Sequence, residues 1–384
     1  MRFLFSKTSM LDAISIAQEV ISTKNINSIL SSILIIAKEE TVFIRATDSK
    51  INYEAQISAQ ISETGTAVVY CNKFIEILNS FSSSEGEEIE FFQEEYEENK
   101  EDIINVIIRP IKGKINFQIK GTPYKKFPEF YFEINTPCFE FPLKEFKEML
   151  AQTSFAVSVE ETRYFLNGVF FEKKGNDLVL VATDGRRLSF VSKPILLGIN
   201  DFPSAIVHPK ILNIILKYAP KEGSILVAII EKRIFFKFAN YEFSVMFLDG
   251  QFPNYDRVIP KKQSFVFYVK RMDLANALNK HILLMLDRKI GRIYFNISQN
   301  RLKITSFQPD VGRVEEEISC EFSGVPCTIA FNFSYIEEPL KVIKTEKVAF
   351  EFTEEMKAVT LRPEPAKDYF HIIMPMYKDD TGTI

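Results

Sequence analysis

One pattern of elements occurs three times along the chain, and this repeat constrains the fold more than any other feature of the sequence. Each copy opens with a short apolar strand that runs into an amphipathic helix, at residues 3–21, 139–157 and 265–283. Each copy has a second strand and helix further on, at residues 67–81, 204–219 and 327–343. Apolar residues at helical spacing, such as Phe146, Met149 and Leu150, predict one buried face on each helix. The repeat therefore predicts three domains of similar architecture.

The rest of each copy reads as strands and turns. At 384 residues the chain is too long for a single core. Pro-containing boundaries divide it into residues 1–136, 137–262 and 263–384. A strand ends near a Thr in each copy, within VFIRATDS, LVLVATDG and LKITSFQP. We therefore expect an α+β protein with two helices per domain in an otherwise β-rich chain.

The most informative stretch lies in the middle, from Arg163 to Phe190. Two apolar runs flank the turn KKGND, which is typical of a β-hairpin. The second run ends in a polar corner, Thr183–Leu188, that carries two adjacent arginines. Gly185 predicts a backbone with positive φ, and the short side chain of Asp184 can accept hydrogen bonds from the freed amides.

Two interpretations of this corner are open. Asp184 has no second carboxylate or histidine nearby in sequence, so general acid–base catalysis is disfavoured. Arg187 beside Leu188 would line a surface, and an arginine next to apolar residues is a common binding anchor. At the far end, Met374-Pro375-Met376 fits core filler better, although methionines also form adaptable peptide-binding surfaces.

The net charge of −4 argues against nucleic acid only if charge is evenly spread. It is not: residues 208–221 and 270–288 carry an excess of Lys and Arg, whereas Glu85–Asp102 holds much of the acid. Basic helices in an acidic chain suit a phosphate backbone that is contacted without sequence reading. The alternative is that these lysines only complement the helix dipoles.

Other sequence signals exclude several classes of site. The chain has no GxxxxGK[ST], GxGxxG or GxSxG motif, and the acidic run lacks a calcium-loop spacing, so it reads as a charged hairpin. The histidines His208, His281 and His371 are far apart, with His281 expected on a polar helix face, and no metal or cofactor is predicted. No run of about eighteen apolar residues exists, so no membrane span is expected. Four scattered cysteines favour structural thiols in the reducing cytoplasm.

Five blocks, RYFLNG, LVATDGRRL, LDGQFPNYDRVIP, FNFSY and MPM, occur in an order and spacing that resemble the bacterial DNA polymerase III beta subunits, the sliding clamps. The resemblance covers the whole chain and implies the DNA-clamp fold, with two chains joined head to tail in a ring-forming homodimer. Such a ring would encircle duplex DNA without reading its sequence, and would catalyse no reaction. Implied partners are the DNA polymerase III alpha subunit, a clamp loader, and other polymerases and repair proteins that compete for one pocket.

The resemblance also implies roles for individual residues. The pocket for partner peptides would lie between the second and third domains and use Leu166, Thr183, Gly185, Arg187, Leu188, Pro253, Arg257, Val258, Asn332, Tyr335, Met356, Ala358, Met374, Pro375 and Met376. Residues facing DNA would be Lys24, Lys73, Lys144, Arg163, Tyr164, Lys210 and Lys217. The dimer seam would use Phe117, Ile282 and Leu283, which could equally be ordinary core residues. Arg186 stands where the family often has His, which adds a cation to the pocket rim.

Two other functions remain as alternatives to a processivity clamp. One is a metal-dependent DNA-processing hydrolase that would use Asp184 and the acidic run. The other is a repeat-domain adaptor that binds peptides but no DNA.

Overall fold

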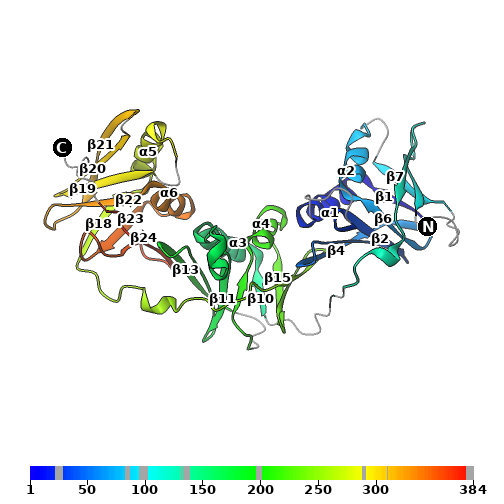
Figure 1. The fold of residues 1–384 in the computed structure, drawn as a ribbon, viewed down its shortest axis with the longest axis horizontal. Helices are drawn as coiled ribbons and strands as arrows, with labels where there is room; N and C mark the ends of the chain where they lie inside the picture. Colours follow the sequence, from blue (N-terminus) through cyan, green and yellow to red (C-terminus); the bar gives the residue numbers. More distant parts are fainter. Residues whose placement is uncertain are drawn as a thin grey trace. The chain divides into compact units, whose positions relative to one another are not determined.

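The computed structural model describes residues 1–21, 29–82, 87–94, 103–130, 132, 139–195, 201–287, 291–308 and 310–377. Within these ranges the predicted strand–helix openings are present as β1 (Arg2–Ser6) with α1 (Lys7–Val20), β10 (Phe139–Pro142) with α3 (Leu143–Thr153), and β18 (Phe265–Lys270) with α5 (Arg271–His281). The second strand–helix units are β6 (Gly65–Tyr70) with α2 (Cys71–Ser80), β14 (Ala205–Val207) with α4 (Pro209–Tyr218), and β22 (Cys327–Asn332) with α6 (Phe333–Val342). The threefold repeat is therefore confirmed (Figure 1).

The described chain forms two compact units. The first comprises mainly Met1–Lys144 and Lys210–Phe247, and the second Glu145–Ile195, Pro203–Pro209 and Leu248–Ile384. The middle repeat thus contributes to both units, because its strands extend the sheets of the repeats on either side.

The first unit contains two antiparallel sheets. An eight-stranded sheet has the order β10, β15 (Ser224–Ile230), β16 (Arg233–Phe238), β17 (Tyr241–Met246), β4 (Ile51–Ser58), β3 (Thr41–Thr47), β2 (Ser32–Lys38), β6. A five-stranded sheet has the order β5 (Gln60–Glu63), β1, β7 (Glu88–Gln93), β8 (Ile104–Pro110), β9 (Phe117–Gly121). Helices α1 and α2 pack against each other. Tyr53 on β4 is fully buried, and its hydroxyl donates a 2.9 Å hydrogen bond to the carbonyl of Ala13 in α1.

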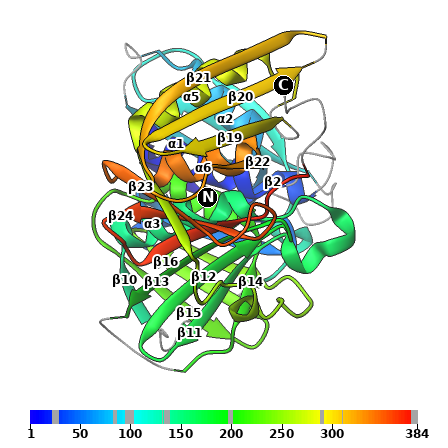
Figure 2. The same ribbon diagram turned by 90° about the vertical axis from the view of Figure 1, so that its left-hand side faces the viewer.

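The second unit is built on a twelve-stranded sheet. Its order is β14, β11 (Val169–Lys174), β12 (Asp177–Thr183), β13 (Arg187–Pro194), β25 (Tyr369–Ile373), β24 (Val359–Glu364), β23 (Lys347–Phe352), β18, β21 (Gly312–Glu321), β20 (Arg301–Gln308), β19 (Arg292–Ser298), β22. Strands β19, β20 and β21 lie side by side (Figure 2). The pairing of β13 with β25 joins the middle repeat to the last one. The predicted hairpin is β11–β12, with Gly175 at φ +65° in its turn.

Some details differ from the sequence prediction. The strand within LKITSFQP does not end near Thr305 but continues to Gln308, because β21 pairs with it up to Gly312. His281 is not on a polar helix face: it is fully buried, and its Nδ1 lies 2.9 Å from Ser306 Oγ. Of the predicted acidic hairpin only part falls within the described residues, where Glu88–Gln93 is strand β7 paired with β8. No helix among the described residues is long and apolar enough to cross a membrane.

A candidate docking site at the Thr183–Leu188 corner

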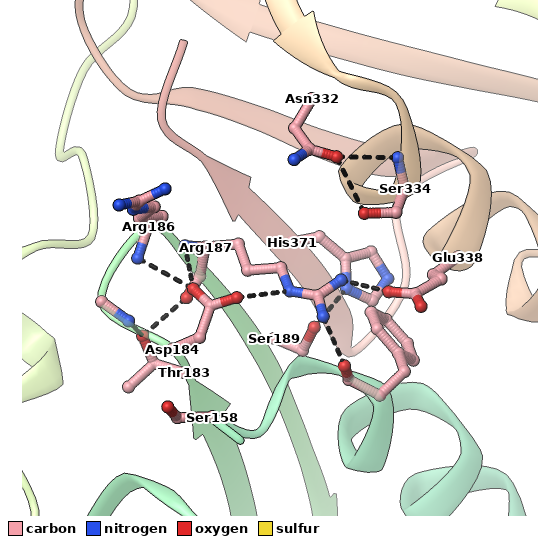
Figure 3. Close-up of polar contacts among 12 residues, drawn as sticks. Ser158, Thr183, Asp184, Arg186, Arg187, Ser189, Asn332, Ser334, Glu338 and His371 are labelled. Carbon is pink, nitrogen blue, oxygen red and sulfur yellow. Dashed lines mark hydrogen bonds and ion pairs between the residues drawn. The ribbon is translucent and has the colours of Figure 1, made fainter. Parts of the chain in front are cut away.

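The corner between β12 and β13 is a tight turn held by its own side chains. Gly185 has φ +87°, a conformation in which a residue without Cβ carries no steric penalty. Asp184 Oδ1 accepts hydrogen bonds from the backbone N–H groups of Arg186 (2.9 Å) and Arg187 (3.0 Å). Thr183 Oγ1 accepts from the N–H of Gly185 at 3.1 Å and donates to the carbonyl of Arg187 at 2.6 Å. The predicted positive φ of Gly185 and the predicted hydrogen bonds to Asp184 are therefore confirmed (Figure 3).

Arg187 is the centre of a polar network that spans two repeats (Figure 3). Its Nε donates to Asp184 Oδ2 at 3.0 Å, and its Nη2 donates to the carbonyl of Phe155 at 2.6 Å. Its Nη1 pairs with Glu338 on α6. The guanidinium also lies over the ring of Tyr335, 4.7 Å from its centroid. Only 11% of the side chain is exposed, because Arg187 uses its donors within the chain; its role as a binding anchor stays a prediction.

A buried histidine lies beneath this network. Nδ1 of His371, on β25, lies 2.9 Å from Ser189 Oγ on the paired strand β13 (Figure 3). The ring is also 5.5 Å from that of Phe155. Burial, reinforced by the charge of Arg187, lowers the pKa of His371 to about 3. The histidine is therefore neutral at physiological pH and adds no second cation under Arg187.

Apolar residues form a wall next to the corner. Leu166 and Leu188 are buried in one cluster that includes Phe252 and Ile372, and Ala358 packs against it. Phe252 stacks on Phe170 with their ring centroids 4.6 Å apart. Leu188 is only 4% exposed, so a partner would meet the edge of this wall rather than a protruding leucine.

The segment after β25 connects the corner to the last repeat. The N–H of Met374 donates to the carbonyl of Arg186 at 2.9 Å, and the N–H of Met376 donates to the carbonyl of Ala330 on β22 at 2.8 Å. Asn332 caps α6, with its Oδ1 accepting from the N–H of Ser334 at 3.0 Å (Figure 3). Met374 is 43% exposed, so the interpretation of this methionine as core filler is wrong. An exposed methionine fixed by its backbone is suited to contact a partner.

The remaining predicted pocket residues lie on loops. Pro253, Arg257 and Val258 are exposed around a short 3₁₀ turn, and Met356 is 40% exposed on the turn between β23 and β24. The structure thus connects one subset of the predicted pocket residues directly, through the corner, the Arg187 network and the apolar wall. These residues are Leu166, Thr183, Gly185, Arg187, Leu188, Tyr335 and Ala358. The loop of Pro253, Arg257 and Val258 is joined to the apolar wall through its buried residues Phe252 and Tyr255. Sequence reasoning missed Glu338 and Phe155, because nothing in their local sequence marks them as partners of Arg187.

The lysines predicted to face DNA are mostly engaged with carboxylates. Lys210 Nζ lies 2.7 Å from Asp48 Oδ2 and 2.6 Å from the carbonyl of Val20. Lys217 pairs with Glu19 at 2.5 Å, and Lys73 with Glu76 at 2.6 Å. Lys144 is exposed, and Lys24 lies outside the described residues.

Arg163 and Tyr164, the other two residues predicted to face DNA, lie on a 3₁₀ segment and are about half exposed. Arg163 is 3.6 Å from Glu160, and its Nη1 would be 2.9 Å from a Cβ built on Gly185. This arginine therefore lies at the rim of the corner.

The candidate seam residues differ in exposure. Phe117 on β9 is half-buried and packs edge-on against Phe81, with centroids 5.6 Å apart. Ile282 is half-buried, whereas Leu283 next to it is 79% exposed. Leu283 is therefore not the core residue that the alternative interpretation required.

Three copies of an α+β domain, each with two helices on antiparallel sheets, define the class of DNA clamps. Family models for the DNA polymerase III beta subunit match in sequence order: the N-terminal domain at residues 1–131, the central domain at 140–254 and the C-terminal domain at 256–377. The chain belongs to the DNA polymerase III beta subunit family. The family and the α+β clamp fold predicted from the sequence are confirmed, as is the function class of a sliding clamp.

The similarity to individual relatives extends over nearly their whole length. The beta sliding clamp of Treponema pallidum (strain Nichols) is 37% identical over 380 residues, covering 98% of this chain and 99% of that protein. The beta sliding clamp of Escherichia coli K12 is 26% identical over 349 residues, or 91% and 92% of the two chains. The griselimycin-bound DnaN sliding clamp of Bartonella birtlesii superposes with a TM-score of 0.89 at 25% identity, covering 98% of this chain and all of that one.

Proposed function

We propose that two copies of this chain close head to tail into a ring that encircles duplex DNA and tethers the replicative polymerase. Membership of the beta subunit family over the full chain is the observation that carries this proposal. The ring would be built from domains 1–136, 137–262 and 263–384, with a seam at Phe117, Ile282 and Leu283. The 79% exposure of Leu283 supports that seam, since burial of an exposed leucine side chain lowers the free energy of the dimer.

The contact with DNA is proposed to be weak and unspecific. Candidate residues remain Lys24, Lys73, Lys144, Arg163, Tyr164, Lys210 and Lys217. Ion pairs at Lys73, Lys210 and Lys217 reduce the charge that each offers to a phosphate. Weak contacts suit a ring that holds DNA by topology, because tight binding to phosphates would oppose sliding.

Partner proteins are proposed to dock at the corner through short peptides with apolar anchors. The polymerase III alpha subunit, the clamp loader, and other polymerases and repair proteins would compete there. The buried wall of Leu166 and Leu188 beside the exposed, backbone-fixed Met374 supports this role. We further propose that the chain catalyses no reaction and acts in the cytoplasm. A hydrolase would need Asp184, but both of its oxygens are already bonded to the turn and to Arg187.

Retention on DNA of different topology tests the ring. The protein is loaded onto nicked circular duplex by the clamp loader of the same organism and separated from free protein by gel filtration. We expect it to remain with the circle at high salt and to be lost after the circle is cut once by a restriction enzyme. Topology is the reason, since a ring can leave only over an end.

The control is DNA that is cut once but has both of its new ends blocked by a bound protein. This linear DNA should retain the clamp. Equal retention on open linear and circular DNA would contradict the ring. Binding of partner peptide without any retention on circles would favour the adaptor alternative.

A further inference from the structure

The corner has a close counterpart at β3–β4 in the first unit. There Thr47 Oγ1 accepts from the N–H of Ser49 at 3.0 Å, as Thr183 accepts from Gly185. Asp48 Oδ1 accepts from the N–H groups of Lys50 at 3.0 Å and Ile51 at 2.7 Å, as Asp184 does from its two arginines. The two turns thus accept the same backbone bonds, but the Thr47 hydroxyl donates to Asn52 Oδ1 whereas that of Thr183 donates to the carbonyl of Arg187.

The segment that crosses each turn is also equivalent. The N–H of Met246 donates to the carbonyl of Lys50 at 3.0 Å, as that of Met374 donates to the carbonyl of Arg186 at 2.9 Å. Both methionines are 43% exposed. Met246 is the last residue of β17 and Met374 directly follows β25, and these strands pair with β4 and β13 in the same register.

This register shows which side chains replace the apolar wall. Asn52 is paired with Ser244 in the first unit, where the second unit pairs Leu188 with Ile372. All four are buried, so the wall has the same position and a different polarity. In the second unit Val359 is paired with Ile373, so Ala358 stands one residue further along, opposite Met374. In the first unit Arg233 is paired with Met246, the counterpart of Met374. Arg233 is therefore the counterpart of Ala358.

Arg233 fills the space that Ala358 leaves open. Its Nε donates to Ser244 Oγ at 2.6 Å, and its Nη2 donates to the carbonyls of Ser244 at 2.9 Å and Lys50 at 3.2 Å. The guanidinium therefore bonds to the same carbonyl as the N–H of Met246, directly beside the turn. Burial lowers the pKa of Arg233, as expected for a side chain enclosed by its neighbours.

Lys210 closes the turn from the helix side. It is the second residue of α4, and its Nζ bonds Asp48 Oδ2 and the carbonyl of Val20. The second residue of α6 is Ser334, whose short side chain donates to Asn332 within its own cap. The first unit thus has a long cation at the helix position where the second unit has a small hydroxyl, although Arg187 covers Asp184 as fully as Lys210 covers Asp48, with 17% and 18% of the two aspartate side chains exposed.

We infer that the chain contains a latent second docking site for the same class of partner peptide, held closed by Arg233 and Lys210. This inference rests on the proposed docking function of the Thr183–Leu188 corner. The backbone frame of the site, with its exposed methionine, is present in the first unit. Arg233 and Lys210, together with the polar pair Asn52 and Ser244, would leave only the second unit to receive the peptide.

Isothermal titration with a synthetic peptide carrying the clamp-binding segment of the polymerase III alpha subunit tests the inference. The wild type should bind one peptide per chain. The double variant Arg233→Ala/Lys210→Ser should bind two, with the second site at least tenfold weaker because Asn52 and Ser244 are polar. Lys232→Ala/Lys221→Ser, which removes two cations close by in sequence, should still bind one.

The reciprocal change isolates the new site. Ala358→Arg should reduce binding at the corner at least tenfold, and adding it to the double variant should leave one site per chain. With ¹³C-methyl methionine, the Met374 signal should shift with peptide in the wild type, and that of Met246 only in the opened variants. These spectra also show whether each variant is folded.

The outcomes separate the two proposals. If the folded wild type binds no peptide, the docking function itself is wrong. If the wild type binds one peptide and the folded double variant still binds one, with no shift of Met246, the latent site is disproved.

Discussion

At the scale of single residues, Arg187 holds elements of the candidate pocket together and exposes little of its own side chain. It neutralises Asp184 and Glu338, which come from different repeats, and it lies between the rings of Phe155 and Tyr335. Removing one partner from such a largely buried network leaves the other charges unpaired, which costs more than losing an exposed ion pair.

We therefore expect Arg187→Ala to lower the free energy of unfolding by about 2 kcal/mol. It should also weaken peptide binding, because the turn and α6 lose their common partner. Urea unfolding and peptide titration measure the two effects. Arg186→Ala, which removes the exposed neighbour, should change the stability by less than about 0.5 kcal/mol. Equal stability losses for the two variants would contradict the network.

The buried histidine predicts a specific pH dependence. The folded pKa of His371 is about 3, below the 6.5 of an unperturbed histidine, so below pH 6.5 the unfolded chain binds a proton that the folded chain does not. Stability is then fully present above pH 6.5 and falls as the pH is lowered towards 3. At pH 5 the loss from this residue is about 2 kcal/mol. Other groups add to it, so the wild type alone is not diagnostic.

The comparison of two variants isolates this contribution. His371→Gln should reduce the difference in unfolding free energy between pH 7 and pH 5 by about 2 kcal/mol, measured by urea unfolding at each pH. Gln251→Ala, at an exposed and uncharged position, should leave that difference unchanged. A His371→Gln difference equal to that of the wild type would show that His371 is protonated in the folded protein.

At the scale of elements, the two equivalent turns differ in one strained position. Gly185 has φ +87°, and Ser49 has φ +77° in the matching turn. A Cβ on Gly185 would lie 2.9 Å from Arg163 Nη1. We expect Gly185→Ala to cost about 1–2 kcal/mol, and Ser49→Gly to stabilise by up to about 1 kcal/mol. Thermal unfolding of both variants checks the signs, and a stabilising Gly185→Ala would show that the turn can adopt another conformation.

Elements of this kind were predictable because their signals are local. Helical spacing located all three opening helices, and the Thr-Asp-Gly sequence predicted both the turn and its bonds. The errors arose where partners distant in sequence decide the outcome. β20 extends to Gln308 because β21 pairs with it, and His281 is buried against Ser306 of that same strand. The exposure of Met374 likewise depends on the strand with which β25 pairs.

At the scale of the whole molecule, the repeat was predictable but the connections between repeats were not. Arg187 and Glu338 are 151 positions apart in sequence, and neither carries a local signal for the other. Likewise, the sequence could not show that Lys210 pairs with Asp48 of the preceding repeat. Such ion pairs depend on how repeats pack, which a periodic pattern of apolar residues does not specify.

The proposed ring makes its last prediction at the seam. Leu283→Asp should convert the dimer to monomer at micromolar concentration, because covering a charged side chain in an apolar contact costs several kcal/mol without a partner. Light scattering coupled to gel filtration measures the mass. Val159→Asp, a change at an 83% exposed apolar residue of the middle domain, which contributes no residue to the proposed seam, should leave the dimer intact. A monomeric wild type at this concentration would contradict the stable ring, and a dimeric Leu283→Asp variant would place the seam elsewhere.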